Sequence, residues 1–396
     1  MAIIFNIGES LKQSAFNILQ EPIKMLMENE KEAFEKESFL SKVFVMKTTD
    51  KYQEEYRSST AMDGFKPTED LERPGLSDFQ EGYGKIFRTQ IWTNSFVVSK
   101  QTIEDNQMMS INAQAMGFIK SYGRTRERYG AAMLSGALAG EIEFEGKKFD
   151  CRGGDTTDGD VDGATKQIYF HNAHKSCVDS SKTQSNKYCV STALDLTKSK
   201  AEEFILDIIG QVQTAMINYQ DDKGNILCVN PDTLVIPNYY GFKNALLTAL
   251  KSQYSSAMGD NGVNLQYGNW NVVVSPYLNG LTGFTEADKA FIMLDSKYNK
   301  EALGAVWFDR VPLTVKSYID EPTEANVWAG RARFGAGFNN FRAMAYVSLK
   351  NGVANATALT PGVSSPTSSP ITKAKKASGS SGSGWLSVKR KRRKER

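Results

Sequence analysis

Apolar residues recur at steps of three and four between residues 102 and 138, among them Ile111, Ala115 and Ile119. This spacing places them on one face of an α-helix, so the sequence predicts a single long helix over the stretch. We expect Thr102 to cap the first turn, because its hydroxyl can accept a hydrogen bond from a free backbone N–H group. At about 1.5 Å per residue the helix would run roughly 50 Å, so its apolar side needs a sheet or other helices laid along it.

Three further stretches have a helical pattern. Residues 199–219 carry apolar side chains on one side, and Ser199 with Glu202 forms a capping-box pattern at the start. A shorter helix is predicted over residues 240–257. Residues 8–38 are also helical in pattern but heavily charged, which favours an exposed arm or a surface helix over a core helix.

The stretch from residue 44 to residue 99 changes character along its length. Its first part is polar and broken by glycine and proline, which interrupt regular structure. Residues 85–99 are rich in aromatic and β-branched side chains and are predicted to form a strand. A long polar excursion that returns as a strand is typical of a projecting hairpin, which has little to bury within one subunit. We therefore expect this hairpin to lie on a neighbouring subunit.

The second half of the chain contains most of the predicted strands. They are expected at residues 226–229, 233–236, 270–275, 304–317 and 326–349. In the last of these, apolar residues such as Phe341 and Val347 alternate with others such as Arg342 and Ser348, which predicts a strand buried on one side only. From Asn355 the composition becomes Thr, Pro, Ser, Gly and Lys, so this tail cannot bury a core and is predicted to be disordered.

Composition is that of a globular protein. The chain has 396 residues, of which 40% are hydrophobic and 23% charged, enough for one large domain or two to three ordinary ones. No apolar run approaches the roughly 18 residues that a membrane span needs, and the N-terminus has no signal-peptide pattern. The four cysteines are few and unevenly spaced, which indicates free thiols in a reducing cytosol. They are Cys151, Cys177, Cys189 and Cys228.

Charge is distributed unevenly along the chain. From Lys373 onward there are ten Lys or Arg residues and one acid, so this segment carries +9, which leaves −6 for the rest of a chain whose total is +3. A mildly acidic body with a basic tail places any nucleic-acid affinity in the tail. A flexible Gly/Ser spacer precedes the most basic block, and the candidate nucleic-acid-binding residues lie in that block. They are Lys389, Arg390, Lys391, Arg392, Arg393, Lys394 and Arg396.

A second candidate site is an incomplete calcium loop. Asp158, Asp160 and Asp162 match the start of a calcium-binding loop. The twelfth position, which should be a bidentate glutamate, is Tyr169 instead. We therefore expect a solvated acidic turn and no bound calcium.

The histidines and nearby cysteines supply zinc-ligand residue types without zinc-site spacing. His171 and His174 lie near Cys151, Cys177 and Cys189, but the spacing matches no common structural zinc site. We expect a loop in which His174 makes a hydrogen bond, and no metal. A metal-dependent enzyme at this cluster is one alternative function, which metal analysis of the purified protein would test.

The sequence gives no pattern for catalysis or cofactor binding. It contains neither a phosphate-binding loop of the G-x-x-x-x-G-K-S/T type nor a G-x-S-x-G nucleophile motif. The glycine-rich segment RARFGAG at residues 331–337 lies inside a strand pattern, so Gly335 and Gly337 are expected to permit a bulge or close packing. We therefore predict that the protein is not an enzyme and needs no cofactor.

Several segments, read in order, resemble the major capsid protein of tailed bacteriophages, which has the HK97 fold, and most of all the Mu-like major head subunit family. The matching segments are SFVVSKQTIEDN at residues 95–106, QIYFHNAH at 167–174, CVNPDTLVIPNYYGFKNAL at 228–246 and VWAGRARFGAGFNNFRAMAYVSL at 327–349. The likeness spans about residues 40 to 350.

This resemblance implies an α+β fold of the HK97-like type, with an N-arm, an extended E-loop hairpin, a long spine helix, and peripheral and axial domains. The expected divisions are residues 1–43 for the N-arm, 44–100 for the E-loop, 101–225 for the peripheral domain with the spine helix, 226–325 for mainly the axial domain, 326–354 for the closing strands and 355–396 for the disordered tail. Both the N-arm and the E-loop would bury their apolar residues on neighbouring subunits.

The resemblance also implies a function. Copies would form pentamers and hexamers of an icosahedral virion capsid that encloses a double-stranded DNA genome and is assembled in the host bacterial cytoplasm. Its partners would be a portal, packaged DNA, a separate scaffolding protein and a decoration protein, with no membrane. The nearest alternative is an encapsulin-like nanocompartment shell, which holds protein cargo. A nucleic-acid-binding protein, argued from the basic tail alone, is a second alternative.

Overall fold

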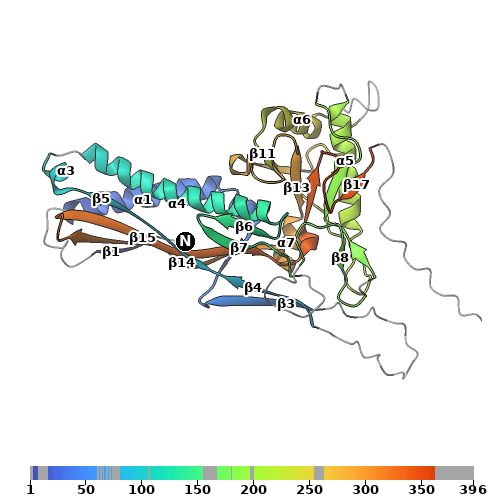
Figure 1. Cartoon of the computed structure of the whole chain (residues 1–396), viewed down its shortest axis with the longest axis horizontal. Coiled ribbons are helices and arrows are strands. Elements are labelled where there is room, and N and C mark those ends of the chain that lie inside the picture. The colour runs from blue at the N-terminus through green and yellow to red at the C-terminus, as the bar shows by residue number, and fades with distance from the viewer. Residues whose placement is uncertain are drawn as a thin grey trace, which may run out of the picture.

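The computed structural model of the chain describes residues 3–7, 17–59, 81–105, 108–154, 167–179, 181–196, 200–253 and 263–361, and single positions between 62 and 73. Figure 1 shows an elongated body, in which a long helix runs beside two long strands, and an upright body at one end of it. Each body has its own sheet and its own cluster of buried apolar residues. None of the helices within the described residues combines the length and apolar character of a membrane span.

The sheet of the elongated body is built on two long antiparallel strands, β14 (Ala305–Asp320) and β15 (Ala325–Phe338). Strand β5 (Gln90–Val98) pairs with β15, and strands β1 (Ile4–Ile7) and β2 (Val45–Thr48) pair with β14. Because β2 and β5 pair within this sheet, the part of the chain that projects is shorter than the predicted E-loop of residues 44–100. Both strands are held in the sheet by their pairing with β14 and β15, so the projecting part lies between them.

Helix α4 (Met108–Gly136) lies along this sheet and is the spine helix. Ile111, Ala115 and Ile119 are fully buried, so the predicted apolar stripe is confirmed. The prediction of one helix from residue 102 is wrong, because a separate short helix, α3 (Lys100–Glu104), precedes α4. The cap of α3 also differs from the predicted one, because the backbone N–H of Thr102 donates a hydrogen bond to the Ser99 hydroxyl at 3.2 Å.

Helix α1 (Asn17–Glu37) packs against α4, followed by the short helix α2 (Leu40–Val43). Ile23 and Met27, one turn apart, are buried, although Glu32 remains exposed. The predicted surface helix is therefore confirmed for this segment, but these apolar residues are buried within its own subunit and not on a neighbour. Gly123 explains how closely the helices pack, because a Cβ at this position would lie within 2.8 Å of the Phe34 ring.

The upright body is a six-stranded sheet among the described residues, in the order β12, β11, β13, β16, β10, β17. These strands are Asn271–Ser275, Thr233–Pro237, Ala290–Leu294, Met344–Ser348, Lys187–Val190 and Thr357–Leu359. Helices α5 (Ala201–Ile217) and α6 (Tyr240–Lys251) supply the apolar side chains that pack with this sheet. Most of these elements follow the predicted pattern. β13 was not predicted, because its run AFIML has no alternation.

Strand β16 lies between the two cores. Met344 and Tyr346 pack in the core of the elongated body, whereas Ala345 and Val347 pack in that of the upright body. The prediction of a half-buried strand is therefore wrong, because each side of β16 faces a core. The predicted strand over residues 326–349 is also interrupted, since the 3₁₀ helix η4 (Phe341–Ala343) separates β15 from β16.

Two further expectations about the upright body need correction. Residues 226–229 form no strand beyond a single bridge between Gln220 and Ile226. The chain after Asn355 does not leave the fold at once, because β17 pairs with β10 and buries Leu359. A short run of Thr and Ala was enough for a strand here, since a neighbouring edge was available.

The remaining elements are short. Strands β3 (Gln53–Ser59) and β4 (Glu81–Arg88) form a projecting two-stranded sheet, which confirms a hairpin in this region. Two more antiparallel pairs are β6 (Glu141–Phe144) with β7 (Lys147–Asp150), and β8 (His174–Lys175) with β9 (Thr183–Gln184). Helix α7 (Ser296–Ala302) and the 3₁₀ helix η3 (Pro276–Leu278) complete the described elements.

Candidate assembly surfaces and the domain cleft

The β3–β4 hairpin is fixed to the elongated body by aromatic packing at its base. Phe87 of β4 lies 5.1 Å from Phe308 of β14 between ring centroids, and Tyr56 of β3 lies 5.8 Å from Phe87. Gly335 and Gly337 make room for this contact. A Cβ at Gly335 would come within 2.6 Å of a backbone oxygen of β4, and one at Gly337 within 2.6 Å of the Phe87 ring. The predicted close packing at these glycines is confirmed.

An ion pair between a buried lysine and an exposed aspartate also holds the base of the hairpin. Lys85 of β4 pairs with Asp150 at the end of β7, and only 4% of the lysine side chain is exposed. Asp150 also accepts from Arg152 at 3.4 Å. Farther out, Met62 and Phe65 are exposed apolar side chains. The hairpin therefore has a rigid base, and its outer apolar residues are not buried within the subunit.

A charged cluster lies between α4 and the sheet. Arg126 pairs with Asp309 at 3.0 Å, and its guanidinium lies 5.1 Å from the Trp307 ring. The Trp307 indole N–H donates to Asp309 at 3.0 Å, so the carboxylate has two partners. Burial raises the pKa of the neighbouring Tyr122 hydroxyl above its usual value. The sequence analysis did not find this pair, because 183 residues separate its members.

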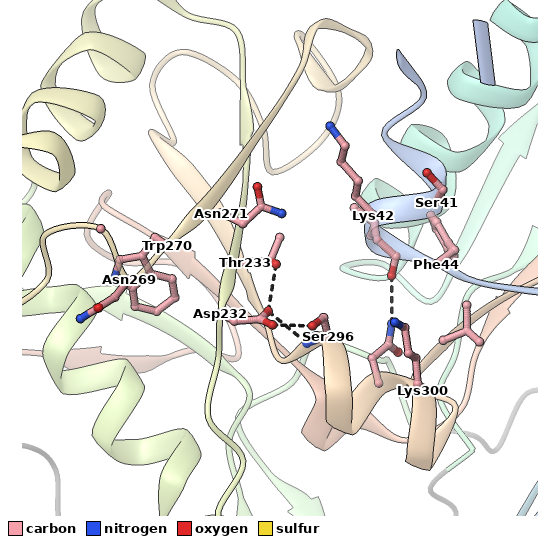
Figure 2. Close-up of a pocket in the computed structure, with 14 residues that line it drawn as sticks. Ser41, Lys42, Phe44, Asp232, Thr233, Asn269, Trp270, Asn271, Ser296 and Lys300 are labelled. Atoms are coloured by element: carbon pink, nitrogen blue, oxygen red, sulfur yellow. Dashed lines mark hydrogen bonds between the residues drawn. The ribbon is translucent and has the colours of Figure 1, made fainter. Parts of the chain in front are cut away.

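A polar cleft of about 650 Å³ separates α2 and β2 from the upright body (Figure 2). Asp232 lies in it and accepts hydrogen bonds from the Thr233 hydroxyl and from the backbone N–H and hydroxyl of Ser296. Across the cleft floor, the Asn299 amide donates to the Val43 carbonyl at 3.0 Å. Asp232 is thus held by neighbours on its own body, and the cleft is a polar seam between the two bodies.

The residues considered for metal binding have structural roles. His174 is buried, its Nε2–H donates a hydrogen bond to Asn186 Oδ1 at 2.9 Å, and its ring stacks on Phe341 with centroids 3.9 Å apart. The predicted hydrogen bond of His174 is confirmed. Burial raises the pKa of the Cys177 thiol to about 11, with a further contribution from the nearby Asp222. Burial also raises the pKa of Cys151.

Within the ranges that the structure describes, no three His, Cys, Asp or Glu side chains are grouped as metal ligands. All four cysteines are free, as predicted. Asp158, Asp160 and Asp162 lie outside the described residues, as does the basic block from Lys389 to Arg396. The last described segment leaves the upright body beside α5, where the Gln211 amide donates to the Thr360 carbonyl at 3.0 Å.

The family model for phage capsid proteins matches residues 82–347, about two thirds of the chain. The matched region runs from the hairpin through the spine helix and includes most strands of both sheets. The chain therefore belongs to the phage capsid protein family, and it has the mixed α and β fold predicted for an HK97-like capsid subunit. It is a structural subunit of a bacteriophage capsid, and this family favours it over the encapsulin-like alternative. No curated protein matches the sequence.

Solved capsid structures align with most of the chain at low identity. The mature capsid protein of bacteriophage PhiM1 is 14% identical, with 81% of this chain and 87% of that chain covered and a TM-score of 0.46. The capsid of the myovirus XM1 is 10% identical, with 78% and 90% covered and a TM-score of 0.47. The capsid of cyanophage P-SCSP1u is 9% identical, with 80% of this chain and 86% of that chain covered and a TM-score of 0.45.

Proposed function

We propose that copies of this chain assemble as pentamers and hexamers into an icosahedral shell that encloses a double-stranded DNA genome. The observation that carries the proposal is the β3–β4 hairpin. Its base is rigid and buried, yet Met62 and Phe65 beyond it are exposed. Burying such side chains against another subunit removes apolar surface from water, the main driving force of association. The role is structural, without catalysis.

We further propose the partners that such a shell needs. A scaffolding protein encoded separately would guide assembly in the host cytoplasm, a portal would admit the DNA, and a decoration protein is a further candidate. The resemblance to the Mu-like head subunits, carried by residues 95–106 and 327–349, supports these assignments. Genes for a portal and a terminase beside the gene for this chain would support a DNA-containing phage head over an encapsulin-like shell, and their absence would count against it.

The basic tail is the proposed nucleic-acid contact of the shell. The block from Lys389 to Arg396 has seven basic residues in eight positions and follows a Gly/Ser spacer. Such a segment neutralises phosphates without reading sequence. Trp385 beside it can add base stacking.

Negative-stain microscopy and sedimentation of the expressed protein test the shell assignment. We expect closed shells or capsomers, with any scaffolding protein supplied. A chain that sediments only as a 43.9 kDa species at high concentration, with the scaffold present, would contradict the proposal. The variant Gln114→Asp, changed at an exposed position of α4, serves as a control for expression and folding.

A further inference from the structure

A cavity of about 330 Å³ lies between the N-terminal elements and the spine helix. Its walls come from α1, α2, β2 and α4, and Asp309 of β14 also lines it. Helix α1 packs beside α4 although the two are far apart in the sequence (Figure 1), so the cavity forms only when the N-terminal segment has docked. Its volume is at the small end of the range found for ligand sites in proteins.

Large apolar side chains form much of the cavity wall. Leu40 and Ile119 line the cavity and also belong to the buried core. Phe34 and Tyr122 are half-buried, and 41% of Met46 is exposed, so these three side chains keep surface that the described elements do not cover. Removing such surface from water is favourable, which means that an apolar molecule in the cavity would be stabilised by the hydrophobic effect.

The charged groups in the wall already have partners. Arg126 pairs with Asp309 at 3.0 Å, and Lys31 pairs with Glu35 at 3.4 Å. Lys47, the remaining charged residue of the wall, places its ammonium over an aromatic ring of β3. A charged ligand would lose its hydration here without gaining an unpaired counter-charge. The cavity is therefore suited to a neutral molecule.

One polar group in the wall is able to serve a ligand. The Tyr122 hydroxyl accepts a hydrogen bond from Arg126 Nη1 at 3.2 Å, and within the described parts of the chain its own O–H proton has no acceptor. Burial raises the pKa of this hydroxyl, so it remains a donor. Because Arg126 and Asp309 line the cavity too, the hydroxyl end of Tyr122 faces it. A ligand oxygen beside this hydroxyl would accept the hydrogen bond.

We infer that this cavity binds a small neutral molecule with an apolar body and one acceptor oxygen, which Tyr122 holds by a hydrogen bond. A mainly apolar wall with a single well-placed polar group is the usual composition of a small-molecule site. The ligand contacts α1, β2 and α4 at once, so it joins the N-terminal elements to the spine helix. This binding site goes beyond the proposed function, since shell formation as proposed needs no small ligand.

Two probes of nearly the same shape separate the hydrogen bond from the apolar contacts. Acetophenone carries a carbonyl oxygen, whereas ethylbenzene has the same ring and a two-carbon substituent without oxygen. Titration of the purified protein with each probe, followed by NMR or calorimetry, measures both affinities. Tyr122→Phe should weaken binding of acetophenone at least about threefold, the effect of one neutral hydrogen bond, and should leave the affinity for ethylbenzene unchanged.

Filling the cavity tests its location. Met46→Trp puts a larger side chain into the wall and should abolish binding of both probes. The matched control is Met25→Trp on α1, which changes an exposed methionine that does not line the cavity and should bind like wild type. Circular dichroism verifies that each variant folds.

Three results would overturn the inference. The first is that neither probe binds wild type up to its solubility limit, or that Met46→Trp leaves binding unchanged. The second is that Tyr122→Phe weakens both probes equally or neither, which removes the acceptor oxygen from the ligand class. The third is that capsomers bind the probes but assembled shells do not, because a side chain of a neighbouring copy would then fill the cavity. Each of these results leaves the proposed function standing, since that function is judged by shell formation alone.

Discussion

Single residues in the elongated body show how closely its interior is specified. Ile111 and Ile119 on α4 are buried, and they lie about two turns apart on the apolar face of the helix. Apolar spacing in the sequence was sufficient to identify them. The same pattern contains no information about Arg126, because its partner Asp309 is brought near only by the fold.

A carboxylate on this stripe should prevent folding. We expect Ile111→Asp or Ile119→Asp to yield insoluble or unfolded protein, because an unpaired buried carboxylate costs several kcal/mol, comparable with the roughly 5–15 kcal/mol of a whole domain. Solubility and circular dichroism provide the measurement, with Gln114→Asp on the exposed side of α4 as control. Soluble mutants that still assemble would mean that the stripe is not buried.

Gly335 should tolerate no side chain. A Cβ there meets a backbone carbonyl oxygen at 2.6 Å, which cannot move without displacing β4. We expect Gly335→Ala to lower the free energy of unfolding by about 1–3 kcal/mol through overpacking. By contrast, Gly117→Ala on α4 has open space and should raise it by up to about 1 kcal/mol, because alanine favours a helix. Thermal melts of both variants make the comparison, and equal shifts would contradict it.

At the scale of elements, the sequence predicted whether a stretch forms a helix or a strand better than it predicted where that element packs. The helices of both bodies and the long strands follow from periodicity, which is a local property. Strand β16 was expected to be half-buried, since apolar residues such as Val347 alternate with others such as Ser348, but two cores meet there. The register of the long sheet could not be predicted at all, because it joins strands that are far apart in sequence.

Folding of the subunit should not require the outer part of the projecting hairpin. Deleting residues 64–84 removes its outer part, including the first residues of β4, and retains Lys85 and Phe87 at the base. We expect a subunit that folds, because the two main cores are untouched, but assembles poorly. Circular dichroism reports folding and sedimentation reports assembly. Shells at normal yield after the deletion would show that the hairpin is not an intersubunit contact.

At the scale of the whole molecule, the body and the tail have opposite charge. A mildly acidic body is suited to a shell that should not adhere to its contents, whereas the basic tail is expected to attract phosphates. The structure describes the chain up to Pro361, beside α5 on the upright body. The tail therefore begins at a defined place on the subunit.

The tail should bind nucleic acid without sequence preference. Affinity is expected to fall steeply with salt, with a log–log slope of roughly −0.7 to −0.9 per phosphate contact. If the tail faces inward, truncation at Ala377 should lower the nucleic acid retained by assembled shells. If it faces outward, added nucleic acid or heparin should aggregate intact shells, and the same truncation should prevent this. A truncated protein indistinguishable from full length in both assays at low salt would leave the tail without a binding role.

The position of β16 also has a mechanical consequence. The hairpin base is fixed to β14 and β15, and β15 leads through a single 3₁₀ turn into β16, the strand that both cores share. A force on the hairpin is therefore transmitted by packing to β15, and from there along continuous backbone through η4 into β16 in the upright body. Because β16 is bonded on both sides, by β13 and β10, the load spreads across the sheet in shear. In a shell of such subunits, we expect internal pressure to be resisted by strands loaded along their length and by the hydrogen bonds between them.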